Sequence, residues 1–370
     1  MEKQKVKKIV FNGLYFASQD RPTGIARHTF EILKELDKIV SSGQFEILAP
    51  ECDIDTTAYK NIKFIKIGYY LSKTNGKAAR ILRIIWQYII FPAYCFSQNA
   101  FTVNTGTAWK HYNFDGISIY DCTPERFYAN SSYKKDFFWM EELIRTQESK
   151  TKTCKLILTD SQSAKADICR IYHVSEEKVQ VIPCGWQHFN NIEEDPEILK
   201  RLGIERHEFF FSLGSRMPHK NIKWISAAAK KHPQYIFVVT GSLVGKNETG
   251  TYFEGEIPGN MFFTGYLKDE EIKSLMRHCK AFIQPSLNEG FGIPPMEAMS
   301  VGADCIVSNA GSLPEVYKNS VWYIDPYDYE NIDLDEIMSR PKESNDIILN
   351  EYSWEKSAKK LLEVLRTNCQ

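Results

Sequence analysis

Short apolar runs and amphipathic stretches alternate along the whole chain. In the first half, apolar runs predict strands at residues 8–11, 45–48, 63–67, 116–119, 156–159 and 179–182. Residues 25–36 carry apolar side chains at helical spacing, and Ser161 is a candidate N-cap for a helix that ends near residue 172. A strand, a loop and a helix in this order are typical of the first unit of an open α/β sheet.

The alternation starts again after an acidic, polar segment at residues 190–196. Here strands are predicted at residues 208–213, 235–240, 261–264, 281–284, 304–308 and 321–324, and helices at residues 223–231 and 269–277. Because alternating strands and helices build parallel sheets, we predict an α/β protein with two doubly wound, Rossmann-like domains, residues 1–190 and residues 191–352. A last helix, from residue 353 to about residue 366, carries one apolar face.

The composition is that of a soluble globular protein. Hydrophobic residues make up 43% of the chain and charged residues 25%, and 370 residues exceed one domain of ordinary size. The formal net charge of -1 gives no reason to expect a nucleic-acid partner. The nine cysteines contain no Cys-x-x-Cys pair, which argues against a zinc or redox motif and suits a reducing cytosol. No segment approaches the ~20 apolar residues of a membrane-spanning helix, so we expect a cytoplasmic protein.

The most informative stretch runs from residue 285 to residue 299 and pairs two carboxylates. Glu289 and Glu297 lie eight positions apart, with Gly290, Gly292 and two prolines between them. Prolines suit a first helical turn, and glycines let backbone N–H groups approach an anion, so a helix should begin just before Glu297. Carboxylates accept hydrogen bonds from sugar hydroxyls. The stretch therefore predicts a site for a ligand that carries both phosphate and hydroxyl groups.

Two cations follow a predicted strand that ends at Gly214. Ligands of open α/β sheets bind beyond the carboxyl ends of the strands, which is where Arg216 and Lys220 stand. Such cations can hold a diphosphate and stabilise its charge as it departs, without a metal. A solvated basic loop is the alternative. In the first turn of the N-terminal helix, Arg27 and His28 either reach the same ligand or face solvent.

Together these motifs resemble the retaining glycosyltransferases of family 4, or glycosyltransferase group 1, which have the GT-B fold. The resemblance covers the paired glutamates, residues 211–222, residues 352–358 and Gly24 before the first helix. It implies two Rossmann-like domains that face each other across a cleft. It also implies an acceptor-side domain at residues 1–190, a nucleotide-sugar domain at residues 191–352, and a C-terminal helix at residues 353–370 that crosses back to the first domain.

The resemblance also implies roles for individual residues. Glu297 would bind the ribose hydroxyls of the donor, and Glu289 the sugar that is transferred. Arg216 and Lys220 would stabilise the leaving diphosphate, and no metal or other cofactor is expected. Further donor contacts, mostly through the backbone, would come from Gly24, Gly214, Gly241, Tyr266, Leu267, Gly290, Phe291 and Gly292. For the glycines, an ordinary structural turn is the alternative.

The chain departs from the family's pattern after the predicted strand at residues 116–119. The family has a His-Asp pair here, with the histidine near the donor sugar, whereas this chain has Tyr120 before Asp121. We expect Asp121 to belong to the catalytic site, with a buried structural aspartate as the alternative. The role of Tyr120 stays open. Glu125 and Arg126 follow as candidates for contacts with the acceptor.

Residues 77–92 are basic at first and then apolar and aromatic. Such a segment is typical of an amphipathic helix on an anionic membrane surface, and slightly more so of an ordinary helix with one buried face. The same region of several relatives in the family contacts membranes or lipid-linked acceptors. The resemblance therefore adds peripheral contact with the inner face of the plasma membrane as a hypothesis.

These observations predict a retaining hexosyltransferase that moves a hexose from a nucleotide-diphosphate sugar to a glycan or lipid-linked saccharide, in cell-surface polysaccharide synthesis. Two alternatives stay open. One is a nucleotide-sugar epimerase of the same fold, and the other is a catalytically silent protein that binds nucleotide sugar in a polysaccharide-assembly complex. The sequence does not identify the sugar, the base, the acceptor, the linkage or the oligomeric state.

Overall fold

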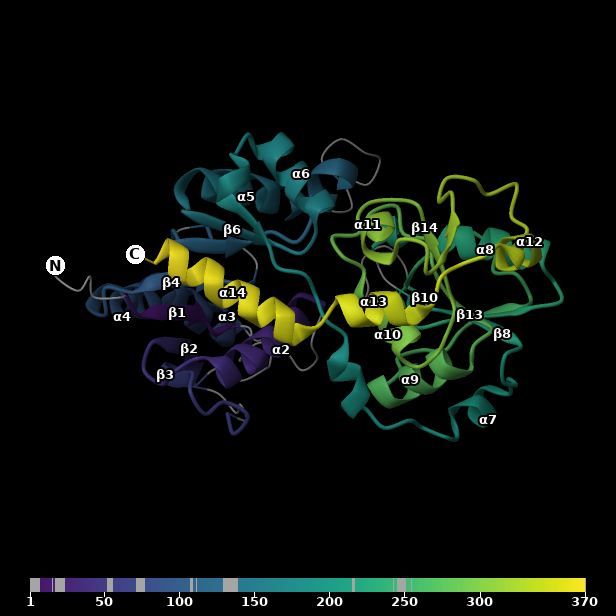
Figure 1. The fold of residues 1–370 in the computed structure, drawn as a ribbon, viewed down its shortest axis with the longest axis horizontal. Coiled ribbons are helices and arrows are strands. Elements are labelled where there is room, and N and C mark those ends of the chain that lie inside the picture. Colours follow the sequence, from purple (N-terminus) through teal and green to yellow (C-terminus); the bar gives the residue numbers. More distant parts are fainter. Residues whose placement is uncertain are drawn as a thin grey trace.

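The described residues of the computed structural model form two large parallel β-sheets, each covered by helices, that lie side by side (Figure 1). The structure describes residues 7–14, 16, 24–51, 56–70, 77–106, 109–110, 112–128, 139–214, 217–241, 243–244, 251–253 and 255–369. The first half of the chain builds one sheet and the second half the other, which confirms the predicted α/β architecture. The domain limits at residues 190 and 352 stay predictions.

The N-terminal unit consists of the first sheet and its helices. Its strands are paired in parallel in the order β3-β2-β1-β4-β5-β6-β7. They are β1 (Ile9–Asn12), β2 (Phe45–Glu51), β3 (Lys63–Tyr70), β4 (Phe101–Asn104), β5 (Gly116–Ser118), β6 (Leu156–Thr159) and β7 (Val179–Val181). The helices are α2 (Gly24–Ile39), α3 (Lys77–Ile85), α4 (Phe91–Ser97), α5 (Trp139–Thr153) and α6 (Gln162–Tyr172).

The C-terminal unit consists of the second sheet, whose parallel order is β12-β9-β8-β13-β14-β15, and its helices. The strands are β8 (Phe209–Ser212), β9 (Ile236–Val239), β12 (Met261–Phe263), β13 (Ala281–Gln284), β14 (Cys305–Ser308) and β15 (Trp322–Ile324), with a short separate pair of β10 (Leu243–Val244) and β11 (Thr251–Tyr252). The helices are α7 (Ile198–Leu202), α8 (Ile222–Lys231), α9 (Asp269–His278), α10 (Ile293–Ser300), α11 (Leu313–Tyr317), α12 (Leu334–Ser339) and α13 (Asn345–Glu351).

The predicted strands are present, but the sequence pattern missed β4 in the middle of the first sheet. β4 pairs with β1 on one side and β5 on the other. Its four residues, Phe-Thr-Val-Asn, do alternate between apolar and polar, but the segment is too short for this alternation to stand out. The predicted N-cap of α6 is confirmed, because the Ser161 side chain accepts a hydrogen bond from the N–H of Ala164 at 3.0 Å.

The last helix, α14 (Trp354–Asn368), crosses from the C-terminal unit back to the N-terminal unit (Figure 1). It packs on α2, and its buried Leu361 and Leu365 share a core with Leu33 and Leu36 of that helix. This confirms the crossing helix that the resemblance implied. Burial of this apolar face ties the two ends of the chain together.

The segment at residues 77–92 forms α3, a π-helical turn at Trp86–Ile90 and the start of α4. Trp86 and Phe91 are buried, whereas Ile84, Ile89 and Phe96 on the same run are 46%, 62% and 90% exposed. The run therefore has both a buried apolar side and an exposed apolar side. None of the described helices is long and apolar enough to cross a membrane.

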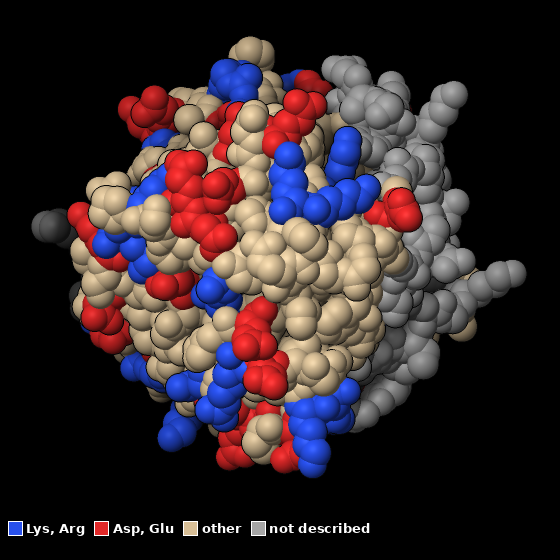
Figure 2. Space-filling model, turned by 90° about the vertical axis from the view of Figure 1, so that its right-hand side faces the viewer, with Lys and Arg blue, Asp and Glu red and all other residues tan. Residues whose placement is uncertain are grey.

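The far end of the C-terminal unit carries both signs of charge. In the face that Figure 2 shows, Lys and Arg are interspersed with Asp and Glu and do not gather into one patch. A mixed surface of this kind gives no reason for steering of a polyanion to that face.

Candidate active site

A cavity of about 320 Å³ lies where the two units meet. The N-terminal unit contributes the start of α2 and the loops after β5 and β6, and the C-terminal unit contributes the loop after β13 and the start of α10. The cavity brings together these predicted site residues: Gly24, Asp121, Lys220, Glu289, Gly290, Phe291 and Gly292. The carboxyl ends of strands from both sheets therefore face a common space.

Two glycines shape the loop between β13 and α10. Gly292 precedes the helix with φ of 83°, a conformation that favours glycine. A Cβ on Gly290 would lie 2.2 Å from the carbonyl oxygen of Tyr120, so a side chain here would push the two units apart. The helix begins at Ile293 with proline in its first turn, as predicted, and this N-terminus lines the cavity.

Lys220 and Glu289 form an ion pair in the cavity. Nζ of Lys220 lies 2.7 and 2.8 Å from the two carboxylate oxygens of Glu289, and Nε2 of Gln284 donates to one of them at 2.9 Å. Burial alone would raise the pKa of Glu289, but the charge of Lys220, with a smaller effect of His219, lowers it below its ordinary value. A bound phosphate would compete with Glu289 for this lysine.

Asp121 stands at the carboxyl end of β5 and faces the same cavity. Its Oδ1 accepts a hydrogen bond from the N–H of Thr123 at 2.7 Å. Burial raises the pKa of Asp121, and the charge of Glu289 adds to the shift while Lys220 opposes it. This hydrogen bond holds the carboxyl group in place at the wall of the cavity.

Tyr120 stands where the resembled family has a histidine, and it is hydrogen-bonded to a histidine from another element. Its hydroxyl donates to the carbonyl oxygen of Thr105 at 2.8 Å and lies 3.3 Å from Nδ1 of His28 on α2. The His28 ring packs edge-on against Tyr120 and Trp354. Burial lowers the pKa of His28 to about 4, so this imidazole is neutral near pH 7. His28 therefore lines the cavity and does not face solvent.

A second cavity, of about 260 Å³, adjoins the first and shares Ile25, Tyr120 and Asp121 with it. Its wall is mostly apolar, with Ile119, Pro124, Met140, Leu143 and Met217 among its residues. At its edge the Tyr128 hydroxyl lies 2.9 Å from Nδ1 of His219, which joins the two units. Two adjoining spaces of different polarity thus meet at Asp121.

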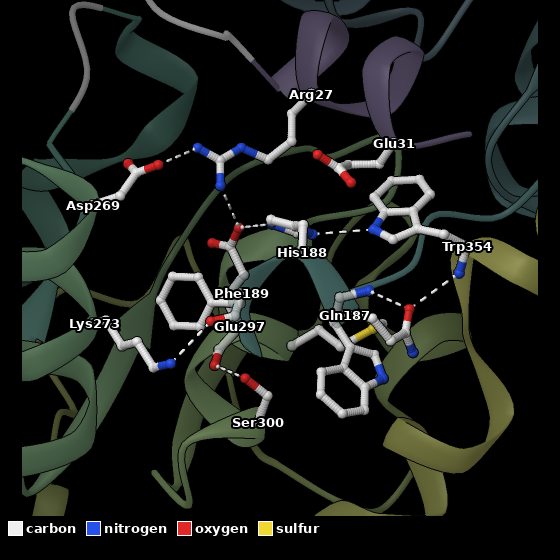
Figure 3. Close-up of polar contacts among 12 residues, drawn as sticks. Arg27, Glu31, Gln187, His188, Phe189, Asp269, Lys273, Glu297, Ser300 and Trp354 are labelled. Carbon is white, nitrogen blue, oxygen red and sulfur yellow. Dashed lines mark hydrogen bonds and ion pairs between the residues drawn. The ribbon is translucent and has the colours of Figure 1, made fainter. Parts of the chain in front are cut away.

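Glu297 belongs to a polar network beside the cavity and is not among its lining residues (Figure 3). Its Oε1 lies 2.8 Å from Nε2 of His188 and 3.7 Å from Arg27, which reaches over from α2 and pairs with Asp269 at 2.7 Å. The indole N–H of Trp354 donates to Nδ1 of His188 at 3.0 Å, so Nε2 carries the proton and donates to Glu297. Both contacts of Glu297 are made by Oε1.

Gly241, Tyr266 and Leu267, predicted as donor contacts, follow strands of the second sheet and are not among the residues that line the 320 Å³ cavity. The backbones of Gly241 and Gly265 exchange hydrogen bonds of 2.7 and 3.2 Å, which joins the loops after β9 and β12. Leu267 is buried, whereas Tyr266 is 60% exposed. Their predicted roles stay predictions.

The loop after β8 is described only in part. The N–H of Gly214 donates to the side chain of Thr240 at 2.8 Å, which fixes the end of the strand. Arg216 lies outside the described residues, so its predicted role stays a prediction. Lys220 is the predicted cation that the structure places in the cavity.

Arg126, a candidate for acceptor contacts, instead bridges the two units. Its Nη1 donates to Oδ1 of Asn288 at 2.8 Å, and Nδ2 of Asn288 donates to Thr123 at 2.8 Å. Glu125 is hydrogen-bonded to the hydroxyl of Tyr172. Their predicted contacts with the acceptor stay predictions.

Sequence reasoning missed several residues at the contact of the units. The Ser161 hydroxyl donates to the carbonyl oxygen of Gly290 at 2.6 Å, and Glu315 accepts from the N–H groups of Gln162 and Ser163 at 2.8 and 2.7 Å. Asp160 lines the cavity and is buried. These partners are more than a hundred positions apart, so no local pattern could have paired them.

Comparison with known families and proteins points to sugar transfer. Residues 194–366 match the family model described as "Glycosyl transferases group 1". O-antigen chain mannosyltransferase RfbU of Salmonella typhimurium is 29% identical over 218 residues, 57% of either chain. O-antigen chain mannosyltransferase B of Escherichia coli is 23% identical over 335 residues, 84% of this chain and 85% of that protein. Serotype-specific mannosyltransferase WbdA of Escherichia coli is 28% identical over 221 residues, 56% of this chain. The chain thus spans about half of RfbU and 26% of WbdA.

Solved structures share the arrangement of the two units. Sucrose-phosphate synthase of Thermosynechococcus elongatus superposes with a TM-score of 0.73 at 14% identity, over 98% of both chains. HepE of Anabaena, solved with UDP and glucose, gives a TM-score of 0.66 at 14% identity, over 98% of this chain and 100% of that one. At such identities the likeness shows the fold, which is GT-B.

Proposed function

We propose that the chain moves a hexose from a nucleotide-diphosphate sugar to a glycan or lipid-linked saccharide, because residues 194–366 match the glycosyl transferases group 1 family. The relatives named O-antigen mannosyltransferases support a role in the synthesis of a cell-surface polysaccharide, with mannose as the first sugar to test. The observation that carries the proposal is the Lys220–Glu289 pair in a cavity that both units enclose.

The larger cavity suits the donor because its wall offers both a cation and carboxylates. Lys220 and the N-terminus of α10 favour an anion, which fits the diphosphate. Glu289 and Asp121 are acceptors, which fits the hydroxyl groups of the sugar. The diphosphate of a nucleotide sugar would then lie next to Lys220, and its sugar next to the carboxylates.

The smaller, more apolar cavity suits the acceptor. It shares Asp121 with the donor cavity, so an acceptor hydroxyl that enters from this side would arrive next to the transferred sugar. The apolar wall formed by Met140, Leu143 and Met217 can pack against the C–H face of a saccharide.

Retention of the anomeric configuration is part of the proposal. In the proposed route, the leaving diphosphate departs on the same face on which the acceptor attacks, and its oxygen takes the acceptor proton as the bond breaks. Lys220, together with Arg216, would stabilise the charge that develops on the diphosphate. Because the diphosphate oxygen takes this proton, the route needs no general base from the protein. This route works without a metal, so turnover should persist in a chelator such as EDTA.

A thermal-shift panel of UDP-, GDP-, ADP- and dTDP-hexoses tests the proposal, because a ligand that binds only the folded state raises the melting temperature. The donor that gives the largest shift is then incubated with and without saccharide acceptors. Slow donor hydrolysis, and transfer when an acceptor is present, would support a transferase. Isomerised donor would support an epimerase, and binding without turnover a silent binding protein.

A cytoplasmic location with peripheral contact to the inner face of the plasma membrane is proposed as well. The exposed apolar side chains Ile84, Ile89 and Phe96 support it, because a surface helix of this kind can insert such side chains between lipid headgroups. The side chains of Lys77 and Arg80, which would add the attraction to anionic lipid, lie outside the described ones.

A further inference from the structure

One buried carboxylate in the donor cavity has no role in the mechanism above. Asp160 follows β6, lines the cavity and is only 5% exposed. Its Oδ1 has no hydrogen-bond partner among the described residues. Buried carboxylates normally meet a cation or hydrogen-bond donors, since an unpaired one destabilises the folded state. An oxygen of this kind on a cavity wall points to a ligand that supplies the missing donor.

Glu315, at the same contact of the two units, is a useful contrast. Both of its carboxylate oxygens accept backbone N–H groups at the start of α6, at 2.8 and 2.7 Å. That arrangement fully explains a structural carboxylate. Asp160 lies just before the same helix but uses no such donor for Oδ1.

The backbone holds Asp160 firmly between the units. The next residue, Ser161, caps α6 and donates its hydroxyl to the carbonyl oxygen of Gly290 at 2.6 Å. A Cβ on Gly290 would lie 3.2 Å from Oδ1 of Asp160, so this oxygen packs against the glycine loop of the other unit. Asp160 therefore reaches the space beside Glu289 only when the two units are closed.

The charge around Asp160 decides which part of a donor it can meet. Its acidic neighbours are Asp121, Glu289 and Glu315, and burial followed by these charges raises its pKa well above the ordinary value. A diphosphate would be repelled from this end of the cavity, whereas uncharged hydroxyl groups can donate to it. Within the part of the chain that the structure describes, no group of three His, Cys, Asp or Glu residues could hold a metal ion there.

We propose that Asp160 accepts a hydrogen bond from one hydroxyl group of the transferred sugar and so helps to select which hexose the protein uses. This inference rests on the proposed glycosyltransferase function. It makes Asp160 a third acidic contact to the sugar, beside Asp121 and Glu289, and one that forms only in the closed molecule.

The test compares wild type with Asp160→Ala, Asp160→Asn and the matched control Glu315→Gln. Calorimetry measures Kd for UDP-glucose, UDP-galactose and GDP-mannose, and for bare UDP and GDP. With the sugar nucleotide that binds best, the 2-, 3-, 4- and 6-deoxy versions of its hexose are then compared in wild type and Asp160→Ala. Melting curves without ligand show whether each variant is folded.

We expect Asp160→Ala to weaken binding of the sugar nucleotide about tenfold, because a hydrogen bond to the buried carboxyl group is lost, with little change for the bare nucleotide. Asp160→Asn should fall in between, and Glu315→Gln should show no such selectivity. For one deoxy donor, the Kd with wild type should be higher than that of the complete sugar nucleotide. With Asp160→Ala, the two Kd values should be equal. Asp160→Asn should also melt no lower than wild type, which a purely structural role does not predict.

Equal Kd values for the sugar nucleotide in wild type and Asp160→Ala would overturn the proposal and leave the glycosyltransferase function intact. The same conclusion follows if each deoxy donor loses the same affinity, relative to the complete sugar nucleotide, with wild type and with Asp160→Ala. If wild type binds the bare nucleotides and none of the three sugar nucleotides, the function proposed above fails, and the role of Asp160 fails with it.

Discussion

Lys220 is the charged group on which the proposed chemistry depends most. It pairs with Glu289, which fixes its charge in the cavity proposed for the diphosphate. Such a preorganised cation costs little reorganisation during the reaction, which is why fixed charges contribute strongly to catalysis. The same pair keeps Glu289 ionised and able to accept hydrogen bonds from a sugar.

We predict that Lys220→Ala lowers kcat by roughly 100- to 1000-fold, because the leaving group loses a fixed positive charge. The matched control is Lys223→Ala, which removes a lysine from the neighbouring helix α8, where it lies over the ring of Tyr329. Initial rates with the donor found in the thermal-shift panel measure the effect. Turnover of Lys220→Ala within a few fold of wild type would contradict the role.

The unpaired charge of Asp160 should also appear in the stability of the protein. The titratable groups around it are Tyr120 and Asp121 after β5, Cys184 after β7, Glu289 after β13 and Glu315 on α11. Burial, followed by the acidic neighbours, raises its pKa above that of the unfolded chain, so the folded protein holds this proton more tightly. Below the unfolded pKa of about 3.9 the carboxyl group is neutral in both states. As pH rises toward the folded pKa, the folded state loses stability.

Asp160→Asn removes this pH-dependent destabilisation without changing the shape of the side chain. Its melting temperature should therefore exceed that of wild type at about pH 7.5, and the difference should shrink as pH falls toward about 4. Melting curves of both proteins across this range test the sign. A difference that stays constant with pH, or that grows on acidification, would show that Asp160 is not a carboxyl group of raised pKa.

The helical run from α3 to α4 exposes several large apolar side chains to solvent. It buries Trp86 and Phe91 against the first sheet, yet leaves Ile84, Ile89 and Phe96 in solvent. Exposed apolar side chains that lie singly on a surface are ordinary, but three on one short run can act together. They are the physical basis for the proposed contact with a membrane surface.

We predict that the double variant Ile84→Ser with Ile89→Ser sediments less with vesicles that contain anionic phospholipid, because less apolar surface enters the headgroup region. Ile347→Ser is the matched control, since Ile347 is 43% exposed but lies on α13 of the other unit. Wild type should bind less well to neutral vesicles. If wild type binds anionic and neutral vesicles equally, or if the double variant binds like the control, the membrane hypothesis is wrong.

Contact between the two units completes the site. Each sheet brings only part of the cavity wall, and the hydrogen bonds Ser161–Gly290, Arg126–Asn288 and Tyr128–His219 hold the parts together. Because these contacts are polar, we expect the units to open and close. Closure would admit the donor and then exclude water from it.

Gly290→Ala should therefore reduce turnover strongly while the C-terminal unit still binds nucleotide. The added Cβ would lie 2.2 Å from the carbonyl oxygen of Tyr120, so the closed molecule could not form without a shift of the backbone. Gly259→Ala is the matched control, because no heavy atom lies within 4 Å of its added Cβ. Small-angle scattering should show a larger radius of gyration for Gly290→Ala alone. Wild-type kcat in Gly290→Ala would refute the idea that this contact is needed.

Local patterns were sufficient for much of the architecture. Apolar runs located the strands that precede Lys220 and Glu289. The order of glycine, proline and glutamate located the start of α10. Both signals depend only on neighbours in the chain. The same patterns missed β4, whose pairing with β1 and β5, and not its own short sequence, makes it a strand.

The tertiary structure alone decided which side chains share the cavity. It placed His28 of α2 beside Tyr120, gave Glu297 the partners His188 and Arg27, and left Asp160 facing the glycine loop. These arrangements join residues that are far apart in sequence. Their distances and burial arise only in the folded molecule, so a pattern of local neighbours could not contain them.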